Sequence, residues 1–189
     1  MQTLLNTPHE IIQQNILGAA AKARTRILNI LVLGMMAGSF IAMGAQSSSL
    51  AVHNISNIGL ARTLAGCIFP VGLMMIVFVG GELFTGDCMM SMAWMQRKIH
   101  FADMLRTLVL VYVSNFVGAA LIAFLVAHSG QYDYSFGALG AYTIKVAYGK
   151  VHLSFANALV SGILCNILVC VAVLMAAAAK DIAGKVLAI

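Results

Sequence analysis

The sequence predicts an all-α integral membrane protein, and its composition, its apolar runs and the positions of its charges all support this class. Hydrophobic residues make up 61% of the 189 positions and charged residues 9%, with a mean hydropathy of +0.96. A soluble domain carries about a quarter charged residues. In water such a chain would expose large apolar patches, so lipid is its expected solvent.

Four apolar segments predict membrane-spanning helices, because a helix needs about 20 predominantly apolar residues to cross the hydrocarbon core. The expected spans lie near 27–45, 64–94, 107–127 and 151–179. The first is too long and too far from the amino terminus to be a cleaved signal peptide. We therefore expect one transmembrane domain over 1–189.

Residues 1–25 precede the first span and predict an amphipathic helix. Thr7-Pro8-His9-Glu10 is typical of a helix start, with a capping side chain, proline at the first position and an acid in the first turn. Apolar and polar positions then separate onto two faces. Both an interfacial helix and a simple extension of the first span fit this pattern.

The distribution of Lys and Arg predicts a cytoplasmic amino terminus, because short cytoplasmic loops are enriched in these residues. Of the 11 basic residues, eight lie on one side of the expected spans: Lys22, Arg24, Arg26, Arg97, Lys98, Arg106, Lys180 and Lys185. Arg62, Lys145 and Lys150 lie on the other. The net charge of +5 is then a topology signal. Because no basic patch is interleaved with aromatic residues, we expect no nucleic-acid partner.

Small residues in two spans predict close helix packing. Gly34 and Gly38 form a GxxxG pattern in the first span, and Gly118 lies inside the third. The partner is either another helix of the same chain or a neighbouring subunit. On the second interpretation these faces would provide the contacts that close a ring of subunits.

The second apolar segment is interrupted by Gly80-Gly81-Glu82-Leu83-Phe84-Thr85-Gly86-Asp87. We expect Glu82 to Asp87 to be non-helical, inside the membrane zone and shielded from lipid, because unpaired backbone groups are costly there. Glu82 then needs freed backbone N–H groups or a polar partner on another helix, and acts as a loop-fastening residue. Alternatively, Gly86-Asp87 merely ends one helix near the interface.

Residues 81–86 (Gly-Glu-Leu-Phe-Thr-Gly), 69–73 (Phe-Pro-Val-Gly-Leu) and 162–170 (Gly-Ile-Leu-Cys-Asn-Ile-Leu-Val-Cys) closely resemble the formate/nitrite transporter family. The resemblance implies an aquaporin-like helical bundle with a broken second transmembrane helix. It also implies a homopentamer with one pore per protomer, passing small monovalent anions (formate, nitrite or hydrosulfide). The expected location is the cytoplasmic (inner) membrane of a prokaryote, with no cofactor, no metal and no catalysis.

The family has six spans in two inverted repeats, each with a broken helix. This chain covers the first four, so we expect the native polypeptide to be longer. The family's pore histidine, in a Gly-Phe-Glu-His-Ser-like motif, would lie in the fifth span, where it would be the plausible proton partner of a permeating weak acid.

The resemblance also implies roles for individual residues. It places these along the substrate path: Phe69, Leu73, Leu83, Phe84, Thr85, Lys150, Asn166 and Val169. Thr85 and Asn166 would offer hydrogen bonds, Lys150 would bias a vestibule toward anions, and the others would form apolar constrictions. Gly81, Glu82 and Gly86 would shape the loop.

Each of these residues also has an ordinary structural interpretation. Phe, Leu and Val at helical spacing are usually packing residues, Lys150 could be a snorkelling side chain, and Asn166 could join two helices. The rival functional class is a membrane-embedded redox or metal-dependent enzyme subunit using Glu82, Asp87 and Cys88. A purely structural membrane subunit is a third interpretation. The four cysteines and five histidines have no metal-ligand spacing.

Overall fold

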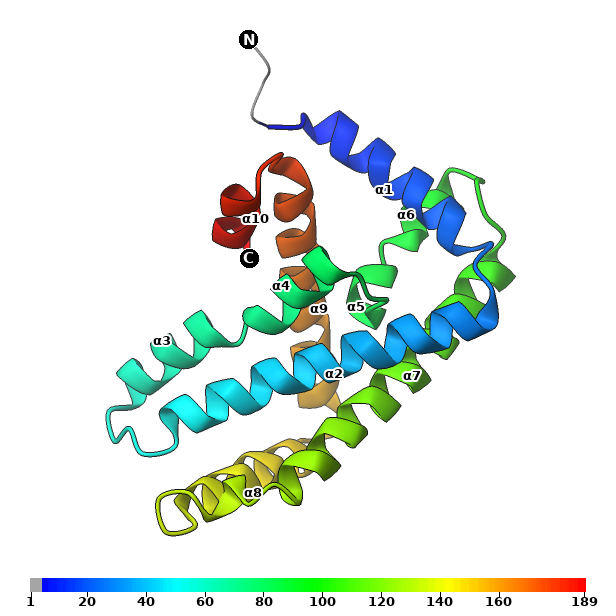
Figure 1. Ribbon diagram of the computed structural model, residues 1–189. Coiled ribbons are helices and arrows are strands. Elements are labelled where there is room, and N and C mark those ends of the chain that lie inside the picture. Colours follow the sequence, from blue (N-terminus) through cyan, green and yellow to red (C-terminus); the bar gives the residue numbers. More distant parts are fainter. Residues whose placement is uncertain (1–4) are drawn as a thin grey trace.

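The computed structural model describes residues 5–189, and all regular secondary structure among them is helical (Figure 1). The helices are α1 (Pro8–Lys22), α2 (Ile27–Val52), α3 (Ile58–Ile68), α4 (Val71–Val79), α5 (Phe84–Asp87), α6 (Met90–Met95), α7 (Phe101–Ala127), the 3-10 turn η1 (Gln131–Asp133), α8 (Ala138–Val151), α9 (Phe155–Ala178) and α10 (Ile182–Ala188). The expectation of an all-α protein is confirmed.

Four helical segments of the described chain are long and apolar enough to cross a membrane. They are Ile27–Val52, Ile58–Val79, Phe101–Ala127 and Phe155–Ala178. The helices extend beyond several of the expected bounds, since α2 continues to Val52 and α7 begins at Phe101. An apolar run predicts only the residues that can lie in lipid. A helix can continue into the flanking polar residues, because its backbone N–H and C=O groups still pair with one another there.

Helices α2 and α7 pack side by side along their length, with α3 and α4 on the opposite side of α2 (Figure 1). Glycines permit this approach. A Cβ atom added at Gly38 would lie 2.0 Å from the backbone oxygen of Asn115, and one at Gly118 would lie 2.0 Å from that of Met35. The small-residue faces are therefore used within the chain. Their alternative assignment as contacts between subunits was wrong, because α2 and α7 occupy each other's glycine faces.

Helix α1 is separate from α2, because residues 23–26 turn the chain between them. Its start is as expected, with reciprocal hydrogen bonds between Thr7 and Glu10 and proline in the first turn. Ile16 and Ala19 are buried against Met90 and Ala93 of α6. The alternative that this segment simply extends the first span is excluded.

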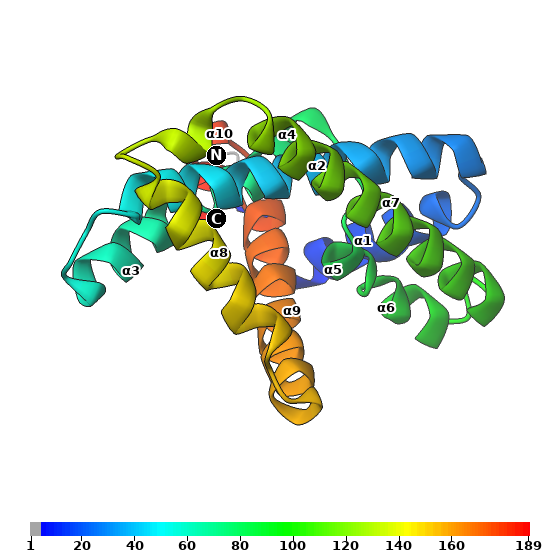
Figure 2. The same cartoon turned by 90° about the horizontal axis from the view of Figure 1, so that it is seen from below.

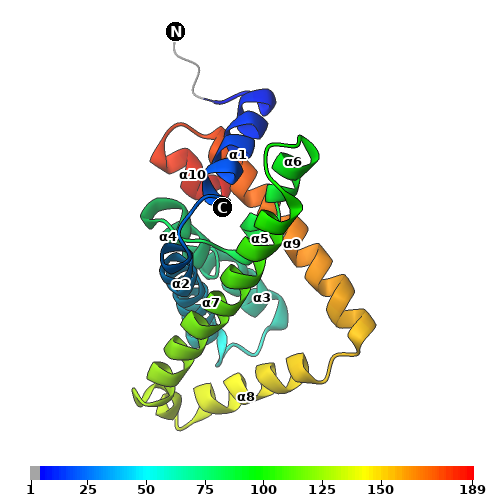
Figure 3. The ribbon, with the colours of Figure 1, turned by 90° about the vertical axis from the view of Figure 1, so that its right-hand side faces the viewer.

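Helices α8 and α9 diverge from the α2–α7 pair (Figures 2 and 3). Helix α8 is an additional helix that the sequence analysis did not predict. Helix α9 then returns to pack against α5 and α1. Most of its large apolar side chains are exposed, including Phe155 at 82% and Leu168 at 71%. This contact between α9 and α5 positions the candidate site.

Candidate functional site

The interruption of the second apolar segment spans residues 80–83. Helix α4 ends at Val79, and Gly80 has φ +98°, a conformation that side-chain-bearing residues rarely adopt. The chain then runs extended to Leu83, and the Glu82 N–H donates to the Leu33 carbonyl of α2 at 3.2 Å. The loop thus pairs part of its backbone with a neighbouring span.

The helix resumes earlier than expected. Phe84–Asp87 form one helical turn, α5, closed by the Asp87 N–H donating to the Leu83 carbonyl at 2.9 Å. The expectation that Glu82 to Asp87 are all non-helical was therefore wrong for Phe84 to Asp87. Once Leu83 is placed, a helical turn satisfies the following backbone groups locally, which an extended path could not do.

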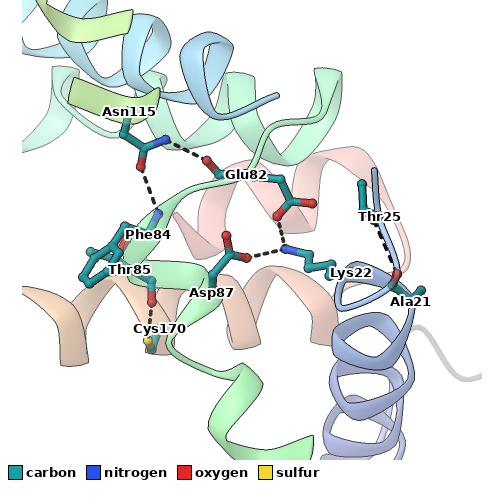
Figure 4. Close-up of polar contacts among 9 residues, drawn as sticks. All are labelled: Ala21, Lys22, Thr25, Glu82, Phe84, Thr85, Asp87, Asn115 and Cys170. Carbon is teal, nitrogen blue, oxygen red and sulfur yellow. Dashed lines mark hydrogen bonds and ion pairs between the residues drawn. The ribbon is translucent and has the colours of Figure 1, made fainter. Parts of the chain in front are cut away.

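Asn115 of α7 fastens the loop with its whole amide group (Figure 4). Its Nδ2 atom donates to the Gly34 carbonyl of α2 and to the Glu82 carbonyl, each at 2.8 Å. Its Oδ1 atom accepts from the Phe84 N–H at 3.0 Å. One side chain thereby joins α2, α7 and the carboxyl-terminal end of the interruption. The sequence analysis did not identify it, although a polar amide within the third apolar run was a signal.

Lys22 of α1 pairs with both carboxylates of the interruption (Figure 4). Its Nζ atom lies 2.6 Å from Asp87 Oδ1 and also forms an ion pair with Glu82. The Asp87 side chain is fully buried, that of Glu82 is 13% exposed and that of Lys22 is 37% exposed. Burial disfavours charged Lys22, but the two carboxylates outweigh this effect and raise its pKa. Lys22 is the polar partner on another helix that Glu82 was expected to need.

Cys170 of α9 contacts both Thr85 and Asn166. The Cys170 thiol of α9 donates to the Thr85 carbonyl at 3.2 Å and lies 3.8 Å from Asn166 Oδ1. The Thr85 hydroxyl oxygen is buried and has no hydrogen-bond partner among the described residues. Since buried hydroxyl groups are normally paired, this hydroxyl is a candidate hydrogen-bond donor.

A hollow of about 350 Å³ lies beside the interruption, between α1, α4, α5 and α9. Leu73 and Leu83, both expected along the path, line it together with Gly81 and Gly86. Lys22 and Asp87 supply its charges. Val169 is half-buried on α9, one turn before Val173 in the wall of the hollow. Phe84 packs edge to face with Tyr112 at a ring separation of 5.4 Å.

Phe69 and Lys150 lie apart from this group. Phe69 follows α3 at its junction with α4 and is 43% exposed. Lys150 lies in the last turn of α8, in a second hollow of about 740 Å³ that Arg62 and Lys145 also line. The three basic residues assigned to one side by sequence therefore share one cavity. Among residues 5–189 no group of three or more His, Cys, Asp and Glu side chains is arranged to hold a metal ion.

Known proteins match this chain over nearly its whole length. The family model described as "Formate/nitrite transporter" matches residues 9–189. The formate channel BtFdhC of Bacillus thuringiensis is 35% identical over 96% of this chain and 71% of its own length. The formate channel FocA of Haemophilus influenzae is 33% identical over 88% of this chain and 60% of its own.

Solved structures give the same result. A chain described as "FNT family ion channel" superposes with a TM-score of 0.85 and 25% identity, over 95% of this chain and 72% of that one. A structure described as "Pentameric formate channel with formate bound" gives a TM-score of 0.75 and 28% identity, over 86% of this chain and 64% of that one. The chain therefore belongs to the formate/nitrite transporter family, a family of multi-pass membrane transporters and not of enzymes.

Proposed function

We propose that this chain conducts small monovalent anions, with formate the first candidate, along a path between α5 and α9. The observation that carries the proposal is the buried Thr85 hydroxyl, which lacks a partner beside the helix interruption. Relatives named as formate channels and a similar structure with formate bound support this class of substrate. Nitrite and hydrosulfide share the charge and small size that such a path requires. The rival hypothesis of a redox or metal-dependent enzyme subunit has no support from these relatives.

The electrostatics of the interruption suit an anion. A dehydrated anion is costly to hold in an apolar constriction unless donors replace its water. Thr85 and Asn166 are uncharged donors, whereas Glu82 and Asp87 would repel an anion if they faced it unpaired. Lys22 pairs with both carboxylates. Its position allows it to fasten the loop while offsetting the negative charge next to the hollow.

The basic residues at the other hollow are proposed to concentrate anions before they enter. Arg62, Lys145 and Lys150 line one cavity, and clustered cations raise the local concentration of anions. Phe69, Leu73, Leu83, Phe84 and Val169 are proposed as the apolar part of the path. Their apolar character and size suit a constriction that admits only an ion stripped of most of its water.

The wider assembly is part of the same proposal. We infer that residues 80–83 interrupt a transmembrane helix within the membrane, in the family's six-span arrangement of two inverted repeats. A homopentamer with one path per protomer is proposed, in the inner membrane of a prokaryote with the amino terminus in the cytoplasm. Transport of the anion together with a proton is also proposed, since formate, nitrite and hydrosulfide all have weak-acid forms.

The test is formate flux into proteoliposomes for Thr85→Val and Thr85→Ser. Valine keeps the shape of threonine without the donor. The loss of a hydrogen bond to a charged group, about 1.5–3 kcal/mol, would slow flux by about 10-fold to 160-fold. Thr85→Ser retains the hydroxyl and should conduct. Glu82→Gln should mainly loosen the loop, without changing which anion passes. Parent-like flux through Thr85→Val, with altered selectivity in Glu82→Gln, would reverse the two roles.

A further inference from the structure

The turn between α6 and α7 contains a hollow of about 350 Å³. Two aromatic residues, three basic residues and one aliphatic residue line it: Trp94, Arg97, Lys98, Ile99, His100 and Phe101. The turn lies at the end of the α2–α7 pair where α1 leads into α2 (Figure 1), and the Arg106 guanidinium of α7 donates to the Ala23 and Thr25 carbonyls there. Phe101 begins one of the four candidate spans, so the hollow lies where the chain enters lipid.

The backbone of this turn is of a kind that usually contains glycine. The Arg97 N–H donates to the Trp94 carbonyl at 2.8 Å, and the Lys98 N–H donates to the Ala93 carbonyl at 2.9 Å. These two bonds form a Schellman motif, in which the residue after the helix adopts a left-handed conformation and is usually glycine. Here that residue is Arg97, with φ +57°. Because glycine would suit the backbone better, the turn itself does not explain an arginine, which points to a role for the side chain.

The two long cationic side chains of the turn have no partner among residues 5–189. Arg97 and Lys98 are exposed, and neither side chain forms a hydrogen bond or an ion pair with the described chain. Nearby basic residues differ, since Lys22 pairs with two carboxylates and Arg106 with backbone carbonyls. Asp103, the acid in the first turn of α7, does not line the hollow. Two adjacent unpaired cations suit an anionic ligand, and the planar N–H fork of arginine matches phosphate oxygens.

The aromatic rings give the hollow an apolar side. Trp94 and Phe101 have ring centres 5.4 Å apart and are 43% and 52% exposed. Tryptophan is enriched at the level of lipid headgroups, where its ring lies against apolar chains and its indole N–H remains in the polar layer. The hollow therefore combines cations with exposed rings, which is the combination that complements a negatively charged lipid.

We propose that this hollow binds an anionic phospholipid, with Arg97 and Lys98 on the phosphate and Trp94 and Phe101 against the first part of the acyl chains. Basic residues clustered beside a membrane span attract anionic headgroups. A soluble phosphate would use the cations but not the rings, so the combination favours a lipid. Binding requires only that the start of α7 lies at the membrane surface, whichever ion the protein conducts.

Trp94 is the only tryptophan of the chain, so its fluorescence reports on this hollow alone. The test is quenching of Trp94 in the whole chain, reconstituted into vesicles of phosphatidylcholine and phosphatidylglycerol. One lipid or the other carries bromine on its acyl chains near the glycerol. Brominated phosphatidylglycerol should quench Trp94 well beyond its share of the mixture. Inorganic phosphate, added at constant ionic strength, should not reduce this preference, because it makes no contact with the rings.

Arg97→Gly removes the guanidinium while suiting the left-handed backbone. Its melting temperature should not fall, which separates lost binding from a lost fold. Since each basic residue near the surface favours anionic lipid by about 5-fold, Arg97→Gly should lower the preference by about that factor, and Arg97→Gly/Lys98→Gln should leave little of it. Arg24→Gln is the matched control. It removes the same charge from an exposed residue that does not line the hollow, and should behave like the parent.

Equal quenching by the two brominated lipids would overturn the proposal, because Trp94 would then contact lipid without selecting its headgroup. An equal loss of preference in Arg24→Gln and Arg97→Gly would assign the preference to net charge and not to the hollow. Competition by inorganic phosphate would identify a site for soluble anions instead of a lipid site.

Discussion

Replacing Asn115 tests whether one amide holds the helix interruption in place. Asn115→Leu has a similar size but removes three hydrogen bonds, to the Gly34 carbonyl, the Glu82 carbonyl and the Phe84 N–H. Such bonds contribute about 0.6 kcal/mol each between membrane helices and about 1 kcal/mol each in soluble proteins. We therefore expect the free energy of unfolding to fall by about 2–3 kcal/mol, measured by titration with a denaturing detergent in mixed micelles.

Ser114→Ala is the matched control for Asn115→Leu. Ser114 is the preceding buried residue of α7, and its hydroxyl donates only to carbonyls of its own helix, Leu110 and Val111. It should cost less than Asn115→Leu and leave the loop unchanged. Hydrogen exchange supplies a local measurement, since the Phe84 amide loses its acceptor only in Asn115→Leu. Equal destabilisation by both variants, with Phe84 still protected from exchange, would refute the role of Asn115.

Three further predictions address other parts of the structure. Gly38→Ala places a Cβ atom 2.0 Å from the Asn115 carbonyl oxygen and should lower stability by about 1–3 kcal/mol, whereas Gly66→Ala, with open space around it, should lower the melting temperature little. Lys22→Gln should lower the melting temperature at neutral pH by removing the partner of two carboxylates, although the partial exposure of Lys22 limits the effect. Because the pKa of Lys22 is raised, its stabilisation is complete below about pH 10.4 and is lost as pH rises through the raised value, so parent and variant should converge only at strongly alkaline pH. Lys150→Gln should reduce anion flux with assembly intact, and unchanged flux for every anion would leave Lys150 a snorkelling residue.

Local chemistry made much of the fold predictable from sequence. Apolar runs identified the spans, and Thr7 with Glu10 identified the start of α1. Gly80 indicated the interruption in the sequence, and the structure shows why glycine is needed there, since its φ is positive. Helix α8 was missed, since its glycines and mixed composition resemble a loop. Several helices extend beyond the bounds expected for the spans, because a helix can continue past the apolar residues that lie in lipid.

The contacts that assemble the site were not predictable in this way, because they join residues far apart in the chain. Lys22 was assigned only to topology, although its side chain reaches Glu82 and Asp87 on a distant segment. Asn115 lies in the third apolar run, and the apolar residues around it indicate a membrane span without indicating a role for its amide. A buried carboxylate in sequence predicts that a partner exists but does not identify the helix that supplies it.

The interruption combines two requirements that oppose each other in most loops. A non-helical segment among spans must pair its polar groups, since each unpaired one is costly away from water. Here Asn115 and Leu33 pair part of the backbone, and Lys22 pairs with both carboxylates. The Thr85 hydroxyl is left without a partner in the described chain. Because the loop is fastened by its backbone and carboxylates, the proposed function would have this hydroxyl donate to a permeating anion while the fold around it stays fixed.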